Sequence, residues 1–342
     1  MRYEIRAASP EDEDDLLALA EHLDSVNLAH DRAHVRALLE QSDASFSGRI
    51  VDPKLRRYVF LLRDLEAHRA VGTSTIIAQL GRRGVPYVYL DVIAEEKYSS
   101  ALDLHFHHVG LRMGYSYDGP TEIGGLVVHP AYRRAPEKLG LAVSYVRFSF
   151  IAAHRDLFED ELLAELMPPL EADGTSHLWE ALGRHFTGMS YQEADRLSSS
   201  NKDFIRELFP SELVYASVLP RAARDVIGKV GAQTRGVEKM LRRIGFRYAE
   251  RVDPFDGGPH FTAGADEVTL IRETRRGRFA GSLGAGEAGR RALLMRELAR
   301  APWLRGVLTQ VAGEGEAVRT APEAAGHLGL APGDEVVWLR LD

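Results

Sequence analysis

The sequence contains no cysteine among its 342 residues. Disulfides, thiolate metal sites and cysteine nucleophiles are therefore excluded. No segment approaches the roughly 20 apolar residues that a membrane-spanning helix needs. The N-terminal segment is acidic and amphipathic, unlike a signal or transit peptide, so we expect a cytoplasmic protein.

The chain also has no excess of positive charge. Its formal net charge is −7, which argues against general binding to nucleic acid or to anionic membranes, so neither partner is expected. A hydrophobic content of 45% and a charged content of 27% are ordinary for a globular protein. The length predicts two domains rather than one.

The clearest local pattern lies in Thr121–Arg155. The short run Ile123–Val128 is apolar and β-branched, as is typical of a buried strand. A proline turn with two arginines follows, and the apolar periodicity of Leu139–Ala153 then predicts a helix. The pattern is therefore a strand, a basic turn and a helix.

This junction favours a polyanionic ligand. The first N–H groups of the helix lack intrahelical partners and point toward the turn, and Arg133, Arg134 and Lys138 add positive charge. The small residues Gly140 and Ala142 would let a bulky anion such as a pyrophosphate approach the backbone closely. The alternative is an ordinary strand-to-helix connection with a basic surface turn.

The whole chain is predicted to have an α+β fold with a mixed sheet. Strands are expected at 1–7, 58–62, 70–77, 87–93, 123–128, 162–167, 246–252, 267–274 and 335–341. Helices are expected at 10–22, 30–39, 139–153, 176–186, 201–208, 220–227, 237–244 and 290–299. The segment 190–200 is expected to be irregular, and 281–289 is glycine-rich.

A histidine-rich segment, 104–108, lies in a further possible strand. Alternation would place His105 and His107 on one face, but zinc needs a third or fourth ligand of the right type. No cysteine or closely spaced acidic pair completes the set. We therefore predict no metal site and expect a substrate-facing or surface cluster.

Several collinear stretches between about residues 55 and 260 resemble the bacterial arginine N-succinyltransferase family, in the Gcn5-related N-acyltransferase superfamily. The matching motifs include His129-Pro130-x-Tyr132-Arg133, WEALGRHF at 179–186, Gly245-Phe246-Arg247-Tyr248, DPFDGGP at 253–259 and the closing LGLAPGDEVVWLRLD. The resemblance implies a Gcn5-related N-acyltransferase-like mixed sheet flanked by helices. We expect this domain at 1–265, with a helical insertion at about 190–235, and a small β-rich C-terminal subdomain at 266–342.

The resemblance also implies a function. It implies transfer of a succinyl group from succinyl-CoA to the α-amino group of arginine or a related basic amine, the first step of an ammonia-releasing arginine degradation pathway. Succinyl-CoA, or another acyl-CoA, would be a cosubstrate, with no permanently bound cofactor, and the chain would form a homo-oligomer. The acyl-CoA-binding residues would be Leu126, Val127, Val128, Arg133, Arg134, Lys138, Leu139 and Gly140.

Acyl transfer to an amine requires a proton acceptor for the ammonium, and a proton for the leaving thiolate assists it. Glu122 is a candidate acceptor and His185 a candidate acid; the alternatives are a structural carboxylate and a helix-end cap. Gly231 stands where the resemblance implies a proton-donating histidine.

Substrate charges need complementary side chains. Asp256 and either Glu193 or Asp195 are candidate partners of a basic amine, with turn-forming or capping roles as alternatives. Arg147 and Arg184 are candidate partners of a succinyl carboxylate. Two further functions stay open: an N-acyltransferase with a different acyl-CoA or amine, and a catalytically weakened acyl-CoA-binding partner subunit.

Overall fold

The computed structural model describes residues 1–22, 31–171, 173–284, 286–314 and 316–341. The chain divides into two compact units, each built from segments far apart in the sequence. Unit 1 comprises Met1–Gln79, Thr121–Asp160 and Ala265–Asp342, and unit 2 comprises Leu80–Pro120 and Glu161–Gly264. This division differs from the expected one, because the C-terminal segment belongs with the N-terminal segment.

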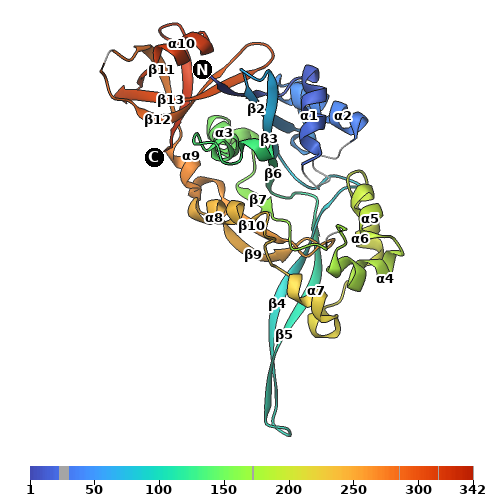
Figure 1. The fold of residues 1–342 in the computed structure, drawn as a ribbon. Coiled ribbons are helices and arrows are strands. Elements are labelled where there is room, and N and C mark those ends of the chain that lie inside the picture. Colours follow the sequence, from blue (N-terminus) through green and yellow to red (C-terminus); the bar gives the residue numbers. More distant parts are fainter. Residues whose placement is uncertain (23–30, 172, 285, 315, 342) are drawn as a thin grey trace. The chain divides into compact units, whose positions relative to one another are not determined.

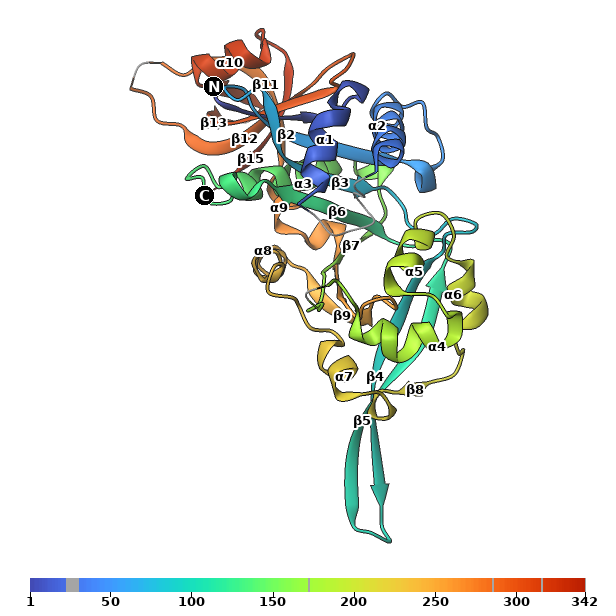
Figure 2. The same cartoon turned by 45° about the vertical axis from the view of Figure 1, so that its right-hand side comes forward.

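The sheet of unit 1 has the strand order β12-β15-β11-β14-β13-β1-β2-β3-β6 (Figures 1 and 2). Strand β13 pairs antiparallel with β1, which places Gly306 opposite Ile5. Because β12 also pairs with β13, strands β11 to β15 close into a small barrel. The strands are β1 (Tyr3–Ala7), β2 (Arg57–Asp64), β3 (Arg69–Ile77), β6 (Thr121–Val128), β11 (Arg275–Ser282), β12 (Arg290–Glu297), β13 (Leu304–Glu314), β14 (Ala317–Thr320) and β15 (Glu335–Arg340).

The helices of unit 1 pack on this sheet through apolar faces. Leu16 and Leu39, from the first two helices, are fully buried in one cluster with Val59 of β2. Helix α3 is buried along nearly its whole length, as its apolar periodicity predicts. The helices are α1 (Glu13–Ala20), α2 (Arg32–Phe46), α3 (Leu139–Ala153), α9 (Thr269–Glu273) and α10 (Pro322–Leu328).

Unit 2 contains strands in the order β7-β10-β9-β4-β5-β8. Its core contains Trp179, whose ring stacks on Phe255 with centroids 5.1 Å apart. The strands are β4 (Tyr87–Ser99), β5 (Leu104–Ser116), β7 (Glu161–Glu165), β8 (Val214–Tyr215), β9 (Arg247–Val252) and β10 (Pro259–Gly264). The helices are a π-helical turn (Trp179–Gly183), α4 (Arg184–Thr187), α5 (Tyr191–Ser198), α6 (Asp203–Leu208), α7 (Arg221–Val226) and α8 (Arg235–Arg243).

Most predicted elements are confirmed within a few residues, but three predictions are wrong. The segment 190–200 contains α5, which begins at a capping box: Ser190 Oγ accepts from the Glu193 N–H, and the Glu193 carboxylate accepts from the Ser190 N–H. The segment 267–274 contains helix α9 instead of a strand, because a helical turn buries Val268 and Ile271 on one face.

The third wrong prediction is the helix at 290–299, which is strand β12. Its residues favour helices by intrinsic propensity. However, Ala292–Met295 are all buried, and β12 pairs with β13 on one side and β15 on the other. Barrel packing therefore overrides propensity. The expected helix at 30–39 begins at Arg32 in the structure, and His30 lies outside the described residues.

No helix in the described part of the chain combines the length and the apolar character needed to cross a membrane.

Candidate active site

Strand β6 carries a β-bulge at its centre. Gly124 lies opposite Thr75 and Val127 opposite Thr73, so two residues of β6, Gly125 and Leu126, face the single Ser74 of β3. Gly125 has φ +55°, and a Cβ there would lie 2.6 Å from Thr75 Oγ1, so the position requires glycine. A bulge leaves its extra residue out of the ladder. The regular β3–β6 ladder is therefore interrupted at Gly125 and Leu126.

The basic turn after β6 is fixed by hydrogen bonds to the backbone. Arg133 Nε donates to the Val128 carbonyl at 2.9 Å, and Tyr132 Oη donates to Asp64 at 3.1 Å. The Arg291 guanidinium donates to the Glu137 carbonyl. Arg133 is exposed, and the turn therefore presents positive charge from a fixed backbone.

Helix α3 begins directly after this turn, as predicted. Lys138 precedes it in the left-handed conformation, φ +55°, and its carbonyl accepts from Leu141 N at 2.9 Å. A Cβ at Gly140 would meet only Val128 Cγ2, at 3.7 Å. Space beside the first turn is therefore open, and the exposed Arg134 and Lys138 flank it in sequence.

Two charged side chains of the predicted site lie buried in unit 1. Glu122 of β6 is 5% exposed and is paired in register with Ile77 of β3. Arg147 of α3 is 2% exposed and donates to the Gly124 carbonyl at 3.1 Å, beside the bulge. It also donates to the Ser144 carbonyl and hydroxyl, at 3.1 and 2.8 Å.

The environment of Arg147 is unusual for a buried cation. No carboxylate among the described residues pairs with it, and burial alone lowers its pKa to about 9. Its three hydrogen bonds leave two of the five guanidinium N–H groups for another acceptor. Since an uncompensated buried charge is costly, this site favours an anionic ligand.

A second polar group lies in unit 2, around the turn that joins β9 to β10. Asp253 Oδ1 accepts from Phe255 N at 2.6 Å, and Asp256 Oδ1 accepts from Gly258 N at 2.7 Å. A Cβ at Gly258 would lie 2.5 Å from the Leu166 carbonyl oxygen. The DPFDGGP motif therefore makes a tight turn that holds two aspartates close together.

Three half-buried aspartates share this region with one lysine. Burial and the neighbouring Asp253 raise the pKa of Asp195 to about 7. Burial and the same neighbour hold the pKa of Asp256 well above its usual range. Lys202 lowers the pKa of Asp195 and of Asp253 but does not balance the three acids. The group is therefore suited to binding a cation.

His260 of β10 borders the same acids. It is fully buried, and its Nδ1 lies 2.9 Å from Tyr87 Oη, while its Nε2 has no hydrogen-bond partner among the described residues. Nε2 is 3.5 Å from Glu165 Oε1, and ligand atoms of His260, Glu165 and Asp253 all lie within 4.8 Å of one another. Burial lowers the pKa of His260 to about 3, so the ring is neutral.

We expect Asp195→Asn to change the pH dependence of stability. The raised pKa means that the folded chain holds a proton that the unfolded chain releases, so stability falls as pH rises from about 4 to 7. The full difference between the folded and unfolded pKa values of Asp195 would change the free energy of unfolding by roughly 4 kcal/mol. Because Asp195 is only half-buried, solvent screening reduces this change to about 1–2 kcal/mol. Urea denaturation at pH 5 and pH 8 measures the free energy of unfolding. Relative to the parent, the variant should be more stable by that amount at pH 8.

The control is Asp225→Asn, which changes an exposed aspartate on α7. It should behave as the parent does at both values. If Asp195→Asn changes the free energy of unfolding equally at pH 5 and pH 8, the predicted titration of the half-buried Asp195 is wrong.

Other predicted residues of unit 2 lie outside the aspartate group. Arg184 is exposed and pairs with Glu180 at 2.8 Å along the helix. His185 is exposed on α4. The carboxylate of Glu193 is engaged in the capping box of α5, with Ser190 Oγ at 2.7 Å. Glu193 and Arg184 thus each make a local contact within unit 2, and their predicted substrate-binding roles stay predictions.

Gly231 is buried against the backbone. Its N–H donates to the Met167 carbonyl at 2.9 Å, and a Cβ would lie 2.7 Å from the Pro168 carbonyl oxygen. The Thr234 hydroxyl also donates to Met167, at 3.0 Å. A histidine therefore cannot be placed at 231 unless the backbone of this loop shifts.

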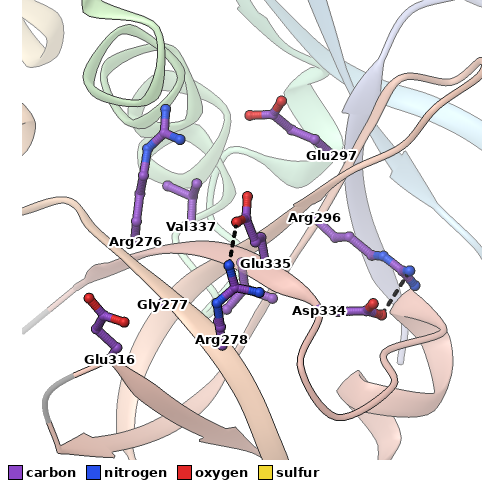
Figure 3. Close-up of a pocket in the computed structure, with 10 residues that line it drawn as sticks. Arg276, Gly277, Arg278, Arg296, Glu297, Glu316, Asp334, Glu335 and Val337 are labelled. Atoms are coloured by element: carbon purple, nitrogen blue, oxygen red, sulfur yellow. Dashed lines mark hydrogen bonds and ion pairs between the residues drawn. The ribbon is translucent and has the colours of Figure 1, made fainter.

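A separate pocket of about 390 Å³ lies in the barrel of unit 1 (Figure 3). Its charges are largely paired: Arg278 contacts Glu335 at 3.0 Å, and Arg296 contacts Asp334 at 2.8 Å. None of the predicted site residues lines it. We therefore assign it no part in the candidate site.

Sequence reasoning missed Asp253, His260, Glu165 and Lys202. β10 was not predicted, so His260 had no expected neighbour. A signal was present in Asp253-x-x-Asp256, where two acids flank a Pro-Phe turn next to two glycines. The bulge at Gly125 could have been suspected from paired glycines inside an apolar strand.

The family model described as Arginine N-succinyltransferase beta subunit matches residues 3–270. An arginine N-succinyltransferase of Yersinia pestis (strain Pestoides F) is 32% identical over 317 residues, covering 91% of this chain and 89% of the relative. That of Yersinia enterocolitica serotype O:8 is 30% identical over 341 residues, covering 98% and 97%.

A solved structure agrees with these sequence relatives. The arginine/ornithine succinyltransferase subunit AI from Pseudomonas aeruginosa superimposes with a TM-score of 0.83 and 25% sequence identity. The superposition covers 99% of this chain and 98% of that one. The agreement therefore includes the C-terminal barrel strands as well as the matched family region.

Proposed function

The chain belongs to the arginine N-succinyltransferase family, and from this premise we propose that it transfers a succinyl group from succinyl-CoA to the α-amino group of arginine or a related basic amine. The relatives carry the name arginine N-succinyltransferase, and the solved relative is named for both arginine and ornithine. The proposal includes a Gcn5-related N-acyltransferase-like fold for the part of the chain that contains the acyl-CoA segment, Thr121–Arg155. It also includes a cytoplasmic location and assembly into an oligomer.

One observation carries this proposal. In unit 1, a bulged strand is followed directly by a basic turn and by a helix whose first turn has open space beside it. The bulge at Gly125 and Leu126 interrupts the ladder, and a backbone N–H group there would be the donor to the thioester carbonyl. The turn adds Arg133, and the first turn of α3 at Gly140 leaves room for a phosphate. One continuous segment would thus provide hydrogen-bond donors for the thioester carbonyl and separate donors for the pyrophosphate.

The reaction requires a neutral amine. Its nitrogen attacks the thioester carbonyl carbon, the C–N bond forms, the C–S bond breaks, and the CoA thiolate takes up a proton. N–H groups of the β6 bulge would stabilise the oxyanion that develops on the carbonyl oxygen. Glu122, buried near the start of the same strand, would accept the ammonium proton directly or through water.

Arg147 would bind the distal carboxylate of the succinyl group. Its guanidinium lies beside the bulge through its bond to the Gly124 carbonyl, and two of its N–H groups remain for an acceptor. A carboxylate would supply the counter-charge that the described residues do not provide. This contact would favour succinyl-CoA over acyl-CoA molecules with uncharged acyl groups.

The aspartates of unit 2 would bind a cationic group such as a guanidinium or an ammonium. Burial raises the pKa values of Asp195, Asp253 and Asp256, and repulsion from Asp253 raises those of Asp195 and Asp256 further. A guanidinium or ammonium would relieve this repulsion, and Lys202 makes the region less suited to a divalent ion. His260 Nε2 would supply a neutral contact at the border of the group.

A second function is favoured by one observation. Gly231 replaces the histidine that the family resemblance implies, and the loop around it has closed to a spacing that excludes a side chain. A chain that had lost its proton donor could serve as an acyl-CoA-binding partner of an active subunit. Because CoA thiolate is a fair leaving group, loss of a dedicated acid does not by itself prevent turnover.

The test is a panel of acyl-CoA and amine pairs with free thiol as the readout. We expect thiol release with succinyl-CoA and arginine or ornithine, and much less with acetyl-CoA or with amines that lack a cationic side chain. Release only with other pairs would replace the proposed substrates. CoA binding without release on any pair would favour the partner-subunit function.

A further inference from the structure

The β4–β5 hairpin of unit 2 places three metal-ligand side chains on one face. Glu96 of β4 lies directly opposite His107 of β5, and Tyr98 lies directly opposite His105. Directly paired residues, and residues two apart on a strand, share a face of the ribbon. The register therefore brings Glu96 next to both histidines, although it is nine residues from the nearer one in sequence.

The side chains themselves converge. Glu96 Oε2 is 3.4 Å from His105 Nε2, and Glu96 Oε1 is 3.3 Å from His107 Nδ1. The two imidazole centroids are 5.0 Å apart, and a set of three ligand atoms lies within 4.8 Å of one another. Bonds of 2.0–2.2 Å in tetrahedral geometry place ligand atoms about 3.3–3.5 Å apart. The carboxylate-to-imidazole distances match that spacing.

We propose that Glu96, His105 and His107 form a binding site for a divalent transition metal ion of the zinc type. Two imidazole nitrogens and one carboxylate oxygen are ligands that Zn²⁺ and Co²⁺ accept, whereas Ca²⁺ and Mg²⁺ prefer oxygen ligands alone. With three protein ligands, the fourth position is left for water or an incoming group.

The register neighbours of the three ligands on this face carry no positive charge. The neighbours on this face are Ala94, Val109 and Tyr98, whereas Lys97 pairs with Phe106 on the opposite face. The three ligands are exposed, so their side chains can adjust to one ion without disturbing a core. They lie beyond Leu90 and Asp91, where β4 pairs with β9, in the half of the hairpin that extends past the rest of unit 2 in Figures 1 and 2.

This site is independent of the proposed acyl transfer. Within the described residues the hairpin face contains none of the aspartates that we assign to the amine, and none of the unit 1 residues that we assign to acyl-CoA. The sequence places His105 and His107 together but provides no third ligand. Only the strand register supplies Glu96.

Titration of the untagged full-length protein with Co²⁺ tests the proposal. We expect one Co²⁺ per chain, with the visible absorption of a low-symmetry four- or five-coordinate ion, and displacement of that signal by Zn²⁺. His105→Ala combined with His107→Ala should abolish the signal, and Glu96→Gln should weaken binding.

His108→Ala is the matched control, because His108 pairs with Glu95 and lies on the other face of the hairpin. It should bind Co²⁺ as the parent does. Equal binding by the parent and the double-histidine variant would overturn the proposal, as would a parent that binds no Co²⁺. Circular dichroism of each variant separates loss of the ligands from loss of the fold.

Discussion

Replacing Arg147 by methionine is expected to lower kcat/KM for succinyl-CoA by about 10²–10³ and to leave kcat/KM for acetyl-CoA nearly unchanged. Breaking a buried charge pair by removing one partner costs about 3–5 kcal/mol, and each 1.4 kcal/mol is a factor of about ten. Arg147 is 2% exposed and has no carboxylate partner among the described residues. A methionine fills similar volume, so the fold should persist without the buried charge.

Arg184→Met is the matched control, since Arg184 was the other arginine predicted to meet the succinyl carboxylate. It lies in an exposed ion pair with Glu180, and its loss should change neither kinetic constant appreciably. Steady-state measurement of kcat/KM with succinyl-CoA and with acetyl-CoA tests this prediction. An equal loss for succinyl-CoA and acetyl-CoA in Arg147→Met would mean that the residue only supports the β6 bulge through Gly124.

Replacing Glu122 by glutamine is expected to lower kcat by about 10²–10⁴, the usual contribution of a positioned general base. The shape of the carboxamide is nearly that of the carboxylate, but it cannot accept the ammonium proton. The variant should therefore regain activity as pH rises, because an amine that is already neutral needs no base. A stopped thiol assay across pH measures both effects.

Glu4→Gln provides the comparison for a merely structural carboxylate. Glu4 is 4% exposed in the same unit and is bound by Arg305 at 2.7 Å and His327 at 2.7 Å. Its replacement should lower the melting temperature and leave the pH profile unchanged. If Glu122→Gln shows that same pattern, Glu122 is a structural residue and the base must be sought elsewhere.

Local patterns predicted the secondary structure of Thr121–Arg155 well, since a strand, a basic turn and a helix all follow from residues close in sequence. Thr121–Val128 and Leu139–Ala153 form with nearly the expected limits. The bulge within β6 was not predicted, because it depends on how β6 pairs with β3. The position of Arg147 beside that bulge depends on the same pairing.

The C-terminal segment was harder to predict because its structure is set by distant partners. Arg290–Glu297 has helical propensity, yet it is a strand because β13 and β15 pair with it on both sides. Strand β13 in turn pairs with β1, at the opposite end of the chain. A short stretch of sequence does not show which distant strands will pair with it.

The acids of unit 2 show the same limit. Asp256 and Asp195 were recognised singly, but the position of Asp253 follows from the turn geometry, and Glu165 meets His260 through the β7–β10 register. Glu96 likewise becomes a neighbour of the histidines only through the β4–β5 register. Residue types indicated the chemistry, whereas strand pairing determined which of them meet.

The most direct test of the account is to identify the bond that forms. Purified protein would be incubated with succinyl-CoA labelled at the thioester carbonyl carbon and arginine labelled at the α-nitrogen, and the product examined by NMR. We predict a one-bond coupling between the two labelled atoms, with one thiol released per amide formed. Thiol release without that coupling, or CoA binding with no release, would contradict the assignment of this chain as an arginine N-succinyltransferase.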